Sequence, residues 1–147
     1  MIKYKLRPAT ESDSSKIHDL IHRVRINPMG LDWQHFVIAA DESDAMLGCG
    51  QLKRHQGDVM ELASIAVEPP YRNQGIARAI IEHLIVQGPR PLYLTCRASL
   101  GPFYEKWGFR PIGRDEMPSY FRRLSRVAAA MSHLFSGDDG LLVMKLM

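Results

Sequence analysis

The chain carries two hydrophobic periodicities, one typical of strands and one typical of helices. Runs of apolar residues, and runs in which apolar and polar residues alternate, predict strands. These runs span residues 2–7, 36–40, 46–55, 59–67, 92–96, 109–112 and 141–146. Apolar residues three and four positions apart predict helices at 12–24, 76–86 and 119–135, with a shorter one at 101–107. Ser12 is the expected N-cap of the first helix.

The order of these elements predicts the fold class. The three runs between residues 36 and 67 are joined by polar turns, which indicates an antiparallel meander. We therefore expect one α+β domain over residues 1–147, with a mixed central β-sheet of about seven strands flanked by helices. The helix at 119–135 is then an insertion between the last two strands.

That inserted helix has a long apolar stripe at three- and four-residue spacing. Its members are Tyr120, Phe121, Leu124, Val127, Ala128, Met131, Leu134 and Phe135. A stripe of this length must be covered, because an exposed one promotes aggregation. Packing on the helix's own sheet, a roof over an acceptor pocket and contact with a second copy in a homodimer all remain open.

Composition and charge narrow the function classes. The net charge of +3 is mild and suits a polyanionic small ligand, whereas nucleic acid has little local support beyond the three arginines at 122, 123 and 126. No apolar run approaches the ~20 residues that cross a bilayer, and the start lacks a secretory signal. We expect a cytoplasmic protein with no membrane contact.

Cysteine and histidine usage bears on metals and redox chemistry. Cys49 and Cys96 stand alone without a CxxC partner, which indicates buried thiols rather than a disulfide framework. The six histidines are scattered and show no HExxH spacing. We therefore expect no metal site.

A polar loop between the strand that ends at Val67 and the helix that starts at Ile76 concentrates chemistry. A helix N-terminus presents unpaired N–H groups and a partial positive charge, which together can bind phosphate. Gly75 allows close approach of the backbone, and Arg72 adds a formal charge. The loop contains neither GxGxxG nor GK[ST]. On these residues alone, a phosphate site and a plain helix start are equal alternatives.

Two motifs in the chain resemble the signatures of one enzyme family. Arg72-x-x-Gly75-x-Ala77, after a strand end that reads Val-x-Pro, resembles the [QR]xxGx[GA] loop of the GNAT superfamily of N-acetyltransferases. In that family the loop amides hold the pyrophosphate of coenzyme A. The segment from Phe103 to Phe109, FYEKWGF, resembles the second family signature, FYxxxGF. The element order also matches the family order over almost the whole chain.

The resemblance implies a binding site for acetyl-CoA. The residues that would wrap the pyrophosphate are Arg72, Asn73, Gln74, Gly75, Ile76 and Ala77. The strand Leu62 to Val67 would carry a bulge and splay from the strand Leu92 to Cys96. The pantetheine arm would then pair with the backbone of Ile65, Ala66 and Val67 as an added strand. Many family members have an Asn after the fifth strand; this chain has none there, and Ser99 or Arg97 is the substitute.

The resemblance also suggests an acid and a base. Tyr104 occupies the position of the general acid, and a phenol can donate a proton to the departing thiolate. Glu61 lies at the start of a nearly apolar strand, where a carboxylate needs a reason to be present. It matches the general base of one histone-acetylating branch of the family. A water chain, or a merely structural Glu61, remains the alternative.

These observations predict an N-acetyltransferase in which a primary amine, on a small molecule or a peptide, attacks acetyl-CoA directly in a ternary complex. The alternative is a non-catalytic acyl-CoA-binding or sensing domain, which the presence of both Glu61 and Tyr104 disfavours. Cys96 as a covalent acyl carrier is disfavoured because no histidine is near it in sequence. The acceptor pocket is expected from residues 27–35 and 117–135, where Asp32 could bind a cationic amine.

Overall fold

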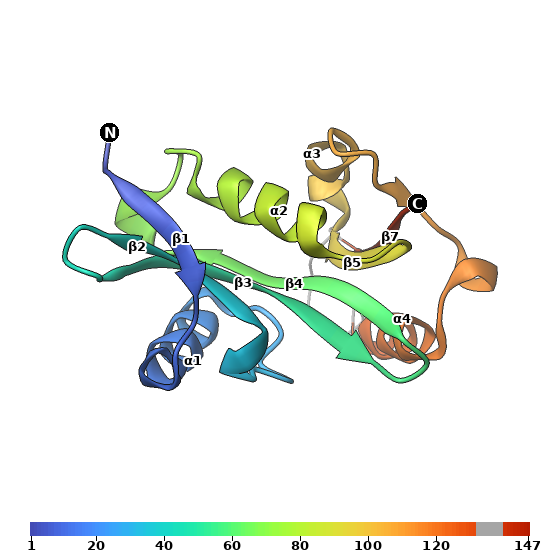
Figure 1. Cartoon of the computed structure of the whole chain (residues 1–147). Coiled ribbons are helices and arrows are strands. Elements are labelled where there is room, and N and C mark those ends of the chain that lie inside the picture. Colours follow the sequence, from blue (N-terminus) through green and yellow to red (C-terminus); the bar gives the residue numbers. More distant parts are fainter. Residues whose placement is uncertain (132–139) are drawn as a thin grey trace. The chain divides into compact units, whose positions relative to one another are not determined.

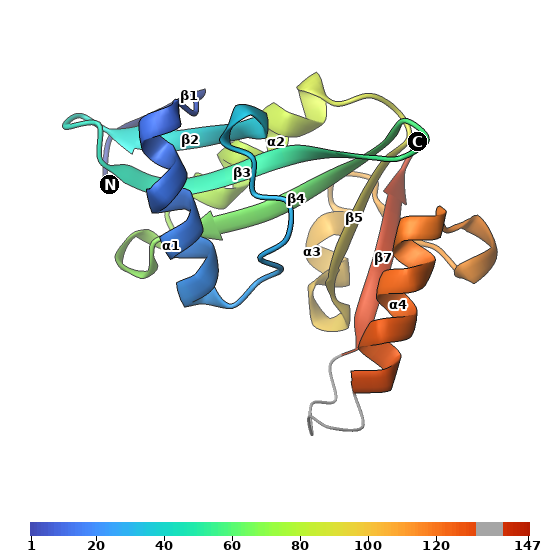
Figure 2. The same cartoon turned by 90° about the horizontal axis from the view of Figure 1, so that it is seen from below.

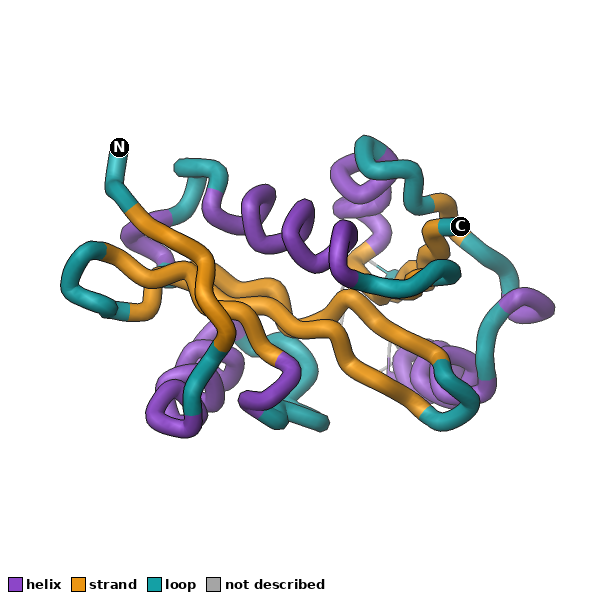
Figure 3. Tube along the Cα trace, viewed as in Figure 1, coloured by secondary structure: helices purple, strands orange, loops and turns teal. Residues whose placement is uncertain are grey.

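The computed structural model of the protein describes residues 1–131 and 140–147. The helices are α1 (Ser14–Val24), α2 (Ile76–Gln87), α3 (Gly101–Glu105) and α4 (Ser119–Met131). The strands are β1 (Tyr4–Pro8), β2 (Phe36–Asp41), β3 (Met46–His55), β4 (Val59–Val67), β5 (Leu92–Arg97), β6 (Arg110–Pro111) and β7 (Leu141–Leu146). Figure 1 and Figure 3 show these elements along the chain.

The strands form one hydrogen-bonded order, β1-β2-β3-β4-β5-β7-β6. The β4–β5 pair is parallel, whereas β1–β2, β2–β3, β5–β7 and β6–β7 are antiparallel. The predicted α+β fold with a mixed seven-stranded sheet is therefore confirmed, as is the position of α4 between β6 and β7. The chain divides into two compact units, residues 1–53 with 62–88 and residues 54–61 with 89–147.

The first unit places helices on both sides of its strands, α1 on one side and α2 on the other (Figure 1). Ile17, Leu20 and Ile21 of α1 are fully buried in a core that includes Phe36 and Ile38 of β2. This apolar spacing is the one that the sequence predicts. Burial of such stripes, rather than helix propensity, supplies most of the stability of a helix this short.

The start of α1 differs from the prediction. The helix begins at Ser14, after a 3₁₀ turn over Glu11–Asp13, so Ser12 is not its N-cap. Thr10 and Asp13 form a capping box around that turn, in which Asp13 Oδ2 accepts the Thr10 amide at 2.8 Å. Asp13 holds the N-cap position of α1 but makes no side-chain cap hydrogen bond to that helix. Its carboxylate closes the preceding 3₁₀ turn and binds a cation from β1 instead.

That cation is Arg7, which binds Asp13 through two hydrogen bonds of 2.7 and 3.0 Å. The Asp13 side chain is only 3% exposed. The Arg7 guanidinium holds the pKa of Asp13 down at about 2, against the opposing effect of burial. A carboxyl whose pKa is lower in the folded state than in the unfolded chain stabilises the fold above the unfolded pKa of about 4, and this stabilisation disappears as the pH falls through about 2.

Replacement Asp13→Asn should therefore lower the free energy of unfolding at neutral pH by about 2–3 kcal/mol. This is somewhat less than a fully buried pair would lose, because Arg7 keeps its 2.9 Å bond to Asp44. Urea unfolding at several pH values measures the effect. The gap between wild type and variant should narrow as the pH falls from about 5 towards 2. Asp44→Asn is the exposed control, with a loss of about 1 kcal/mol or less. A gap that stays constant with pH would contradict this account.

The second unit is built around β5 and β7, which pair over six residues from Leu92↔Leu146 to Arg97↔Leu141. Helix α4 lies along β7 (Figure 2). Its buried Phe121 packs with Tyr93, Ile112 and Val143. Helix α3 and the loop after it pack against the other face of β7. Gly101 and Gly108 lie so close to Leu142 and Leu146, respectively, that an added Cβ would contact these side chains.

The apolar stripe of α4 is covered only in part. Phe121 is buried and Tyr120, Leu124 and Ala128 are half-buried, but Val127 is 55% exposed and Met131 45% exposed. Complete packing on the helix's own sheet is therefore wrong for the second half of the helix. The first turn is anchored because only it carries the large rings that fill the space over Tyr93. Leu134 and Phe135 lie outside the described residues. None of the described helices is long and apolar enough to cross a membrane.

Candidate active site

The start of α2 leaves a run of backbone amides without hydrogen-bond partners among the described residues. Gly75 is its N-cap in the left-handed conformation (φ +83°), and Asn73 is also left-handed (φ +64°). The first helical hydrogen bond runs from Ala79 N to Gly75 O. Within the described chain, none of the six backbone amides from Asn73 to Arg78 donates to a protein acceptor. Successive free amides at a helix N-terminus form a cradle for phosphate groups.

Side chains hold this loop in place. Arg72 Nε donates to Val67 O at 3.2 Å and thereby ties the loop back to the end of β4. Gln74 Oε1 accepts the Ile2 amide at 3.1 Å. The Gln74 side chain is thus used structurally, and its backbone is the part left for a ligand. The remaining nitrogens of Arg72, an exposed residue, keep its positive charge available at the same loop.

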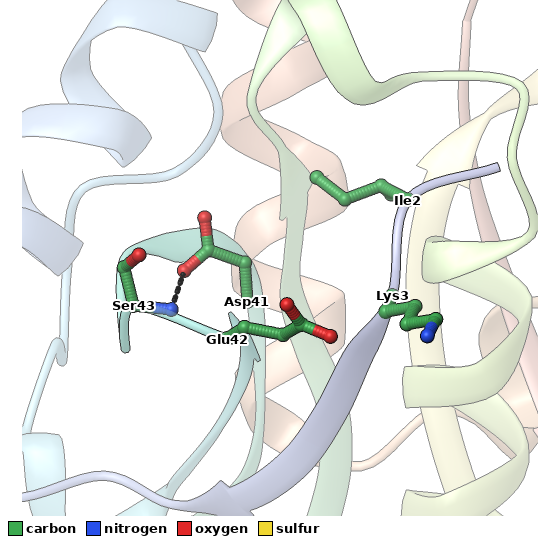
Figure 4. A pocket seen from close by; sticks show the side chains of 5 residues that line it. All are labelled: Ile2, Lys3, Asp41, Glu42 and Ser43. Atoms are coloured by element: carbon green, nitrogen blue, oxygen red, sulfur yellow. Dashed lines mark hydrogen bonds between the residues drawn. The ribbon is translucent and has the colours of Figure 1, made fainter.

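A shallow pocket of about 320 Å³ lies beside Ile2, lined also by Lys3, Asp41, Glu42 and Ser43 (Figure 4). The Asp41 carboxylate in this pocket already has a structural role. Asp41 Oδ1 accepts the amides of Ser43 at 2.8 Å and Ala45 at 2.9 Å, which closes the β2–β3 turn. We therefore do not assign a ligand to it.

Strand β4 bends at Ser64, a left-handed residue (φ +59°) inside the strand and at the place where the bulge is expected. The bend is supported by buried Gln51 of β3, whose Nε2 donates to Ser64 Oγ at 2.9 Å and to Gly30 O at 3.1 Å. In the other direction along β4, the parallel ladder with β5 consists of Met60↔Leu92 and Glu61↔Tyr93. The residues predicted to meet pantetheine, Ile65 to Val67, follow the bend directly.

Glu61 is buried, with 5% of its side chain exposed, and it has a close partner. His55 Nε2 lies 2.7 Å from Glu61 Oε1. The imidazole stacks on the ring of Tyr120, with centroids 3.7 Å apart, and meets the edge of Phe121 at 5.7 Å. Glu61 is therefore neither exposed to water nor paired with Arg or Lys among the described residues; it is a buried carboxylate paired with histidine.

His55 and Tyr120 also line an open pocket of about 440 Å³. The other lining residues are Gln56, Gly57, Val59, Pro118, Ser119 and Arg123. This pocket joins the β3–β4 turn to the start of α4. Part of the segment predicted to shape the acceptor side, residues 117–135, therefore lines a pocket. Glu61 is in contact with one lining residue of that pocket, His55.

Tyr104 lies in α3 within an aromatic cluster. Its ring centroid is 5.1 Å from that of Phe103 and 6.2 Å from those of Trp107 and Phe109. Burial, with a smaller contribution from Cys96, raises the pKa of Tyr104 to about 12. The phenol therefore stays protonated over the whole working range of an enzyme and can always donate a hydrogen bond. Full transfer of its proton to a thiolate, whose conjugate acid has a pKa of about 8.5, is uphill by roughly 5 kcal/mol.

The remaining candidate residues are two cysteines, a serine and an aspartate, and their surroundings differ. Cys96 is buried against Met144, with 3.9 Å between the sulfurs. Burial raises the pKa of Cys49 to about 12, as expected of an inert core thiol. Ser99 is exposed in a 3₁₀ turn over Ala98–Leu100. Asp32 Oδ1 accepts the Gln34 amide at 3.0 Å as the N-cap of a 3₁₀ turn, and contact of this exposed carboxylate with an amine stays a prediction.

The family is shown by comparison with known proteins. The model of the acetyltransferase (GNAT) domain matches residues 32–111, more than half of the chain. This chain belongs to the GNAT acetyltransferase family. The matched region contains both the free amides at the start of α2 and Tyr104, so the sequence-based identification is confirmed.

The relatives of this GNAT chain include an enzyme from Escherichia coli K12, [ribosomal protein bS18]-alanine N-acetyltransferase. It is 36% identical over 83 residues, which cover 50% of this chain and 56% of the relative. The chain thus spans about half the length of the curated relatives that it matches.

Solved structures show the same fold. N-acetylglutamate synthase from Neisseria gonorrhoeae, complexed with coenzyme A and N-acetyl-glutamate, superimposes with a TM-score of 0.74 at 22% identity, covering 100% of this chain and 36% of that one. The ribosomal-protein-S18-alanine N-acetyltransferase from Escherichia coli gives 0.68 at 21% identity, covering 98% and 93%. At such identities the likeness establishes the fold alone.

Sequence reasoning missed the surroundings of Glu61. His55 and Tyr120 are 65 residues apart in the chain, and no motif links them. One weak signal was present, because the two-residue period of β3 places Gln51, Lys53 and His55 on one face. Three polar residues on one face of a largely buried strand indicate that this face meets other polar groups.

Proposed function

We propose that this chain is an N-acetyltransferase that moves an acetyl group from acetyl-CoA to a primary amine by direct attack in a ternary complex, with residues 1–147 acting as one catalytic domain. The observation that most strongly supports this proposal is the run of free amides from Asn73 to Arg78 beside Arg72. Such a cradle suits the two phosphate groups of a pyrophosphate, and family membership supplies a donor that contains one.

The donor contacts follow from this cradle. The amides of Asn73, Gln74, Gly75, Ile76 and Ala77 would bind the pyrophosphate oxygens, with the charge of Arg72 in support. The backbone of Ile65, Ala66 and Val67 would pair with pantetheine after the bend at Ser64. Ser99 would replace the asparagine that many family members have. We also propose that this arrangement uses no metal.

In the reaction, the ammonium form of the acceptor first loses a proton, and the neutral nitrogen attacks the thioester carbonyl carbon. The C–N bond forms and the C–S bond breaks, so the electron pair leaves on the coenzyme A sulfur. Tyr104 would donate a hydrogen bond to that sulfur, because its raised pKa keeps the phenol protonated. Glu61 would aid removal of the proton from the amine.

The acceptor is proposed to be the primary amine of an amino acid, a peptide or another small molecule. The names of two similar proteins support this class, since one is a ribosomal-protein alanine N-acetyltransferase and the other an N-acetylglutamate synthase. We also propose a cytoplasmic location. A homodimer would cover the exposed Val127 and Met131 of α4.

The decisive experiment is a screen of amines, polyamines, amino acids and peptides for thiol release that depends on both acetyl-CoA and the amine. Mass spectrometry of the product should show one added acetyl group. Tight binding of acetyl-CoA without transfer to any amine would instead favour a non-catalytic acyl-CoA sensor.

Replacement Glu61→Gln tests the base. Loss of the carboxylate should lower kcat/KM by about 10²-fold and remove the acidic limb that this group contributes to the pH–rate profile. The profile between about pH 5 and 9 should be measured at constant ionic strength. An unchanged profile would indicate a water chain or a different base. Glu116→Gln is a control on an exposed carboxylate, which is paired with Arg110 at 2.8 Å.

A further inference from the structure

The strongest unassigned feature is the pair of His55 and Glu61. Both side chains are nearly enclosed, with 10% of His55 and 5% of Glu61 exposed. Their contact is 2.7 Å long, in the range of charge-assisted hydrogen bonds. A carboxylate this buried is costly without such a donor. Enclosure and a short contact together mean that the state of one group depends on the other.

The length of the contact requires one shared proton between the two atoms. At 2.7 Å a proton must lie between His55 Nε2 and Glu61 Oε1, and with a carboxylate as acceptor this proton belongs to Nε2. Among the described residues, His55 provides the only hydrogen bond to the carboxylate, so Oε2 is left for another donor. The donor that the reaction supplies is the acceptor ammonium, directly or through water.

The imidazole itself is held from a second element. Tyr120 of α4 stacks on it at 3.7 Å with an interplanar angle of 23°, and Phe121 closes the edge. Aromatic rings prefer such offset-stacked and edge-to-face arrangements, so these contacts favour one orientation of the imidazole plane. The start of α4 therefore sets the plane of His55, and His55 sets the carboxylate of Glu61.

We propose that His55 is the positioning residue for the base: its Nε2–H holds Glu61 Oε1, so that Oε2 is presented to the amine in a fixed orientation and in the charged form. The inference deepens the proposed function and depends on it for the role of Glu61. It goes beyond the family comparison because His55 and Tyr120 belong to neither family motif.

Among the described residues, charged and titratable groups of several elements lie around the pair. Besides Glu61 of β4, the groups facing His55 are the Tyr120 phenol and the Arg123 guanidinium of α4, which share its pocket. From β5, Tyr93 packs on Phe121, and Lys145 of β7 lies 5.9 Å from the Tyr93 ring. Among the described residues neither Arg123 nor Lys145 forms an ion pair with Glu61, so removal of the His55 donor should be visible above their background.

The first test uses the wild-type protein and needs no activity. Nitrogen-15 NMR of the histidine rings, at about pH 9 where an ordinary imidazole is neutral, should show a proton on His55 Nε2. The ring signals should change in Glu61→Gln and stay unchanged in Glu116→Gln. A bare Nε2 in the wild type would overturn the proposal, whatever the activity of the protein.

The second test is kinetic. His55→Leu removes the hydrogen-bond donor and keeps an apolar group under Tyr120. We expect kcat to fall by about tenfold or more. The acidic limb of kcat/KM should move to higher pH, because the carboxylate loses its stabilising hydrogen bond. His55→Gln, whose amide nitrogen can replace Nε2, should restore both. His18→Leu, on the exposed face of α1, is the matched control.

The outcomes separate the two proposals. A His55→Leu protein with the wild-type pH profile would overturn the positioning role, and so would a His55→Gln protein no better than His55→Leu. A wild-type protein that acetylates no amine would instead contradict the proposed function, and the NMR result alone would then decide whether His55 holds Glu61.

Discussion

Replacement Gly75→Glu should weaken the binding of coenzyme A by about 100-fold or more, which corresponds to about 3 kcal/mol. Two effects act together. Gly75 has φ +83°, a conformation that costs a residue with a side chain about 1–2 kcal/mol. The added carboxylate would also lie at the mouth of the free amides, where it competes with the pyrophosphate and repels it. Isothermal titration calorimetry with coenzyme A measures the loss directly.

Two further variants separate these effects. Gly75→Ala introduces the backbone strain without the charge, and a Cβ at this position would meet no atom within 4 Å. It should weaken binding by about tenfold or less. Gly57→Glu is the matched control, because Gly57 is also left-handed (φ +81°) with open space around its Cβ but lies in the β3–β4 turn. It should leave coenzyme A affinity unchanged. Unchanged affinity in Gly75→Glu would mean that the pyrophosphate lies elsewhere.

Replacement Tyr104→Phe should lower kcat by about 10²- to 10⁴-fold, the usual contribution of a group that serves the leaving atom. Donor affinity should change little, because the ring and its packing on Phe103, Trp107 and Phe109 remain. The result is read from steady-state kinetics together with calorimetry. A fully active Tyr104→Phe protein would remove the residue from the mechanism.

The size of the loss distinguishes two roles for the phenol. With a pKa of about 12, Tyr104 is a poor donor of a whole proton to a thiolate but a good hydrogen-bond donor. We therefore expect a value near the lower end of the range. The same pKa predicts that Tyr104 causes no basic limb in the pH–rate profile below about pH 11. A basic limb near pH 9 that disappears in Tyr104→Phe would contradict the raised pKa. Trp107→Phe, a change in the same aromatic cluster, controls for packing.

The sequence by itself determined the elements and the family. Strand β3 from Met46 to His55 and strand β4 from Val59 to Val67 begin and end where the hydrophobic pattern predicts. Periodicity succeeds there because a strand buried in a sheet must carry apolar residues over its whole length. The candidate loop for the acetyl donor could also be recognised from the sequence. Its helix start, its glycine and its arginine lie within a few residues of one another.

Only the tertiary structure decided what surrounds the candidate base. Glu61 could have faced water or an arginine, and nothing in its neighbourhood along the chain selects His55 and Tyr120 as its partners. The exposure of Val127 and Met131 could not be predicted from the sequence either. A helical stripe shows which residues share a face, but it does not show how far the opposing surface extends. Local propensities and motifs depend on contiguous residues and can be recognised in the sequence. The partners of a buried charge depend on strand pairing and helix packing between distant segments.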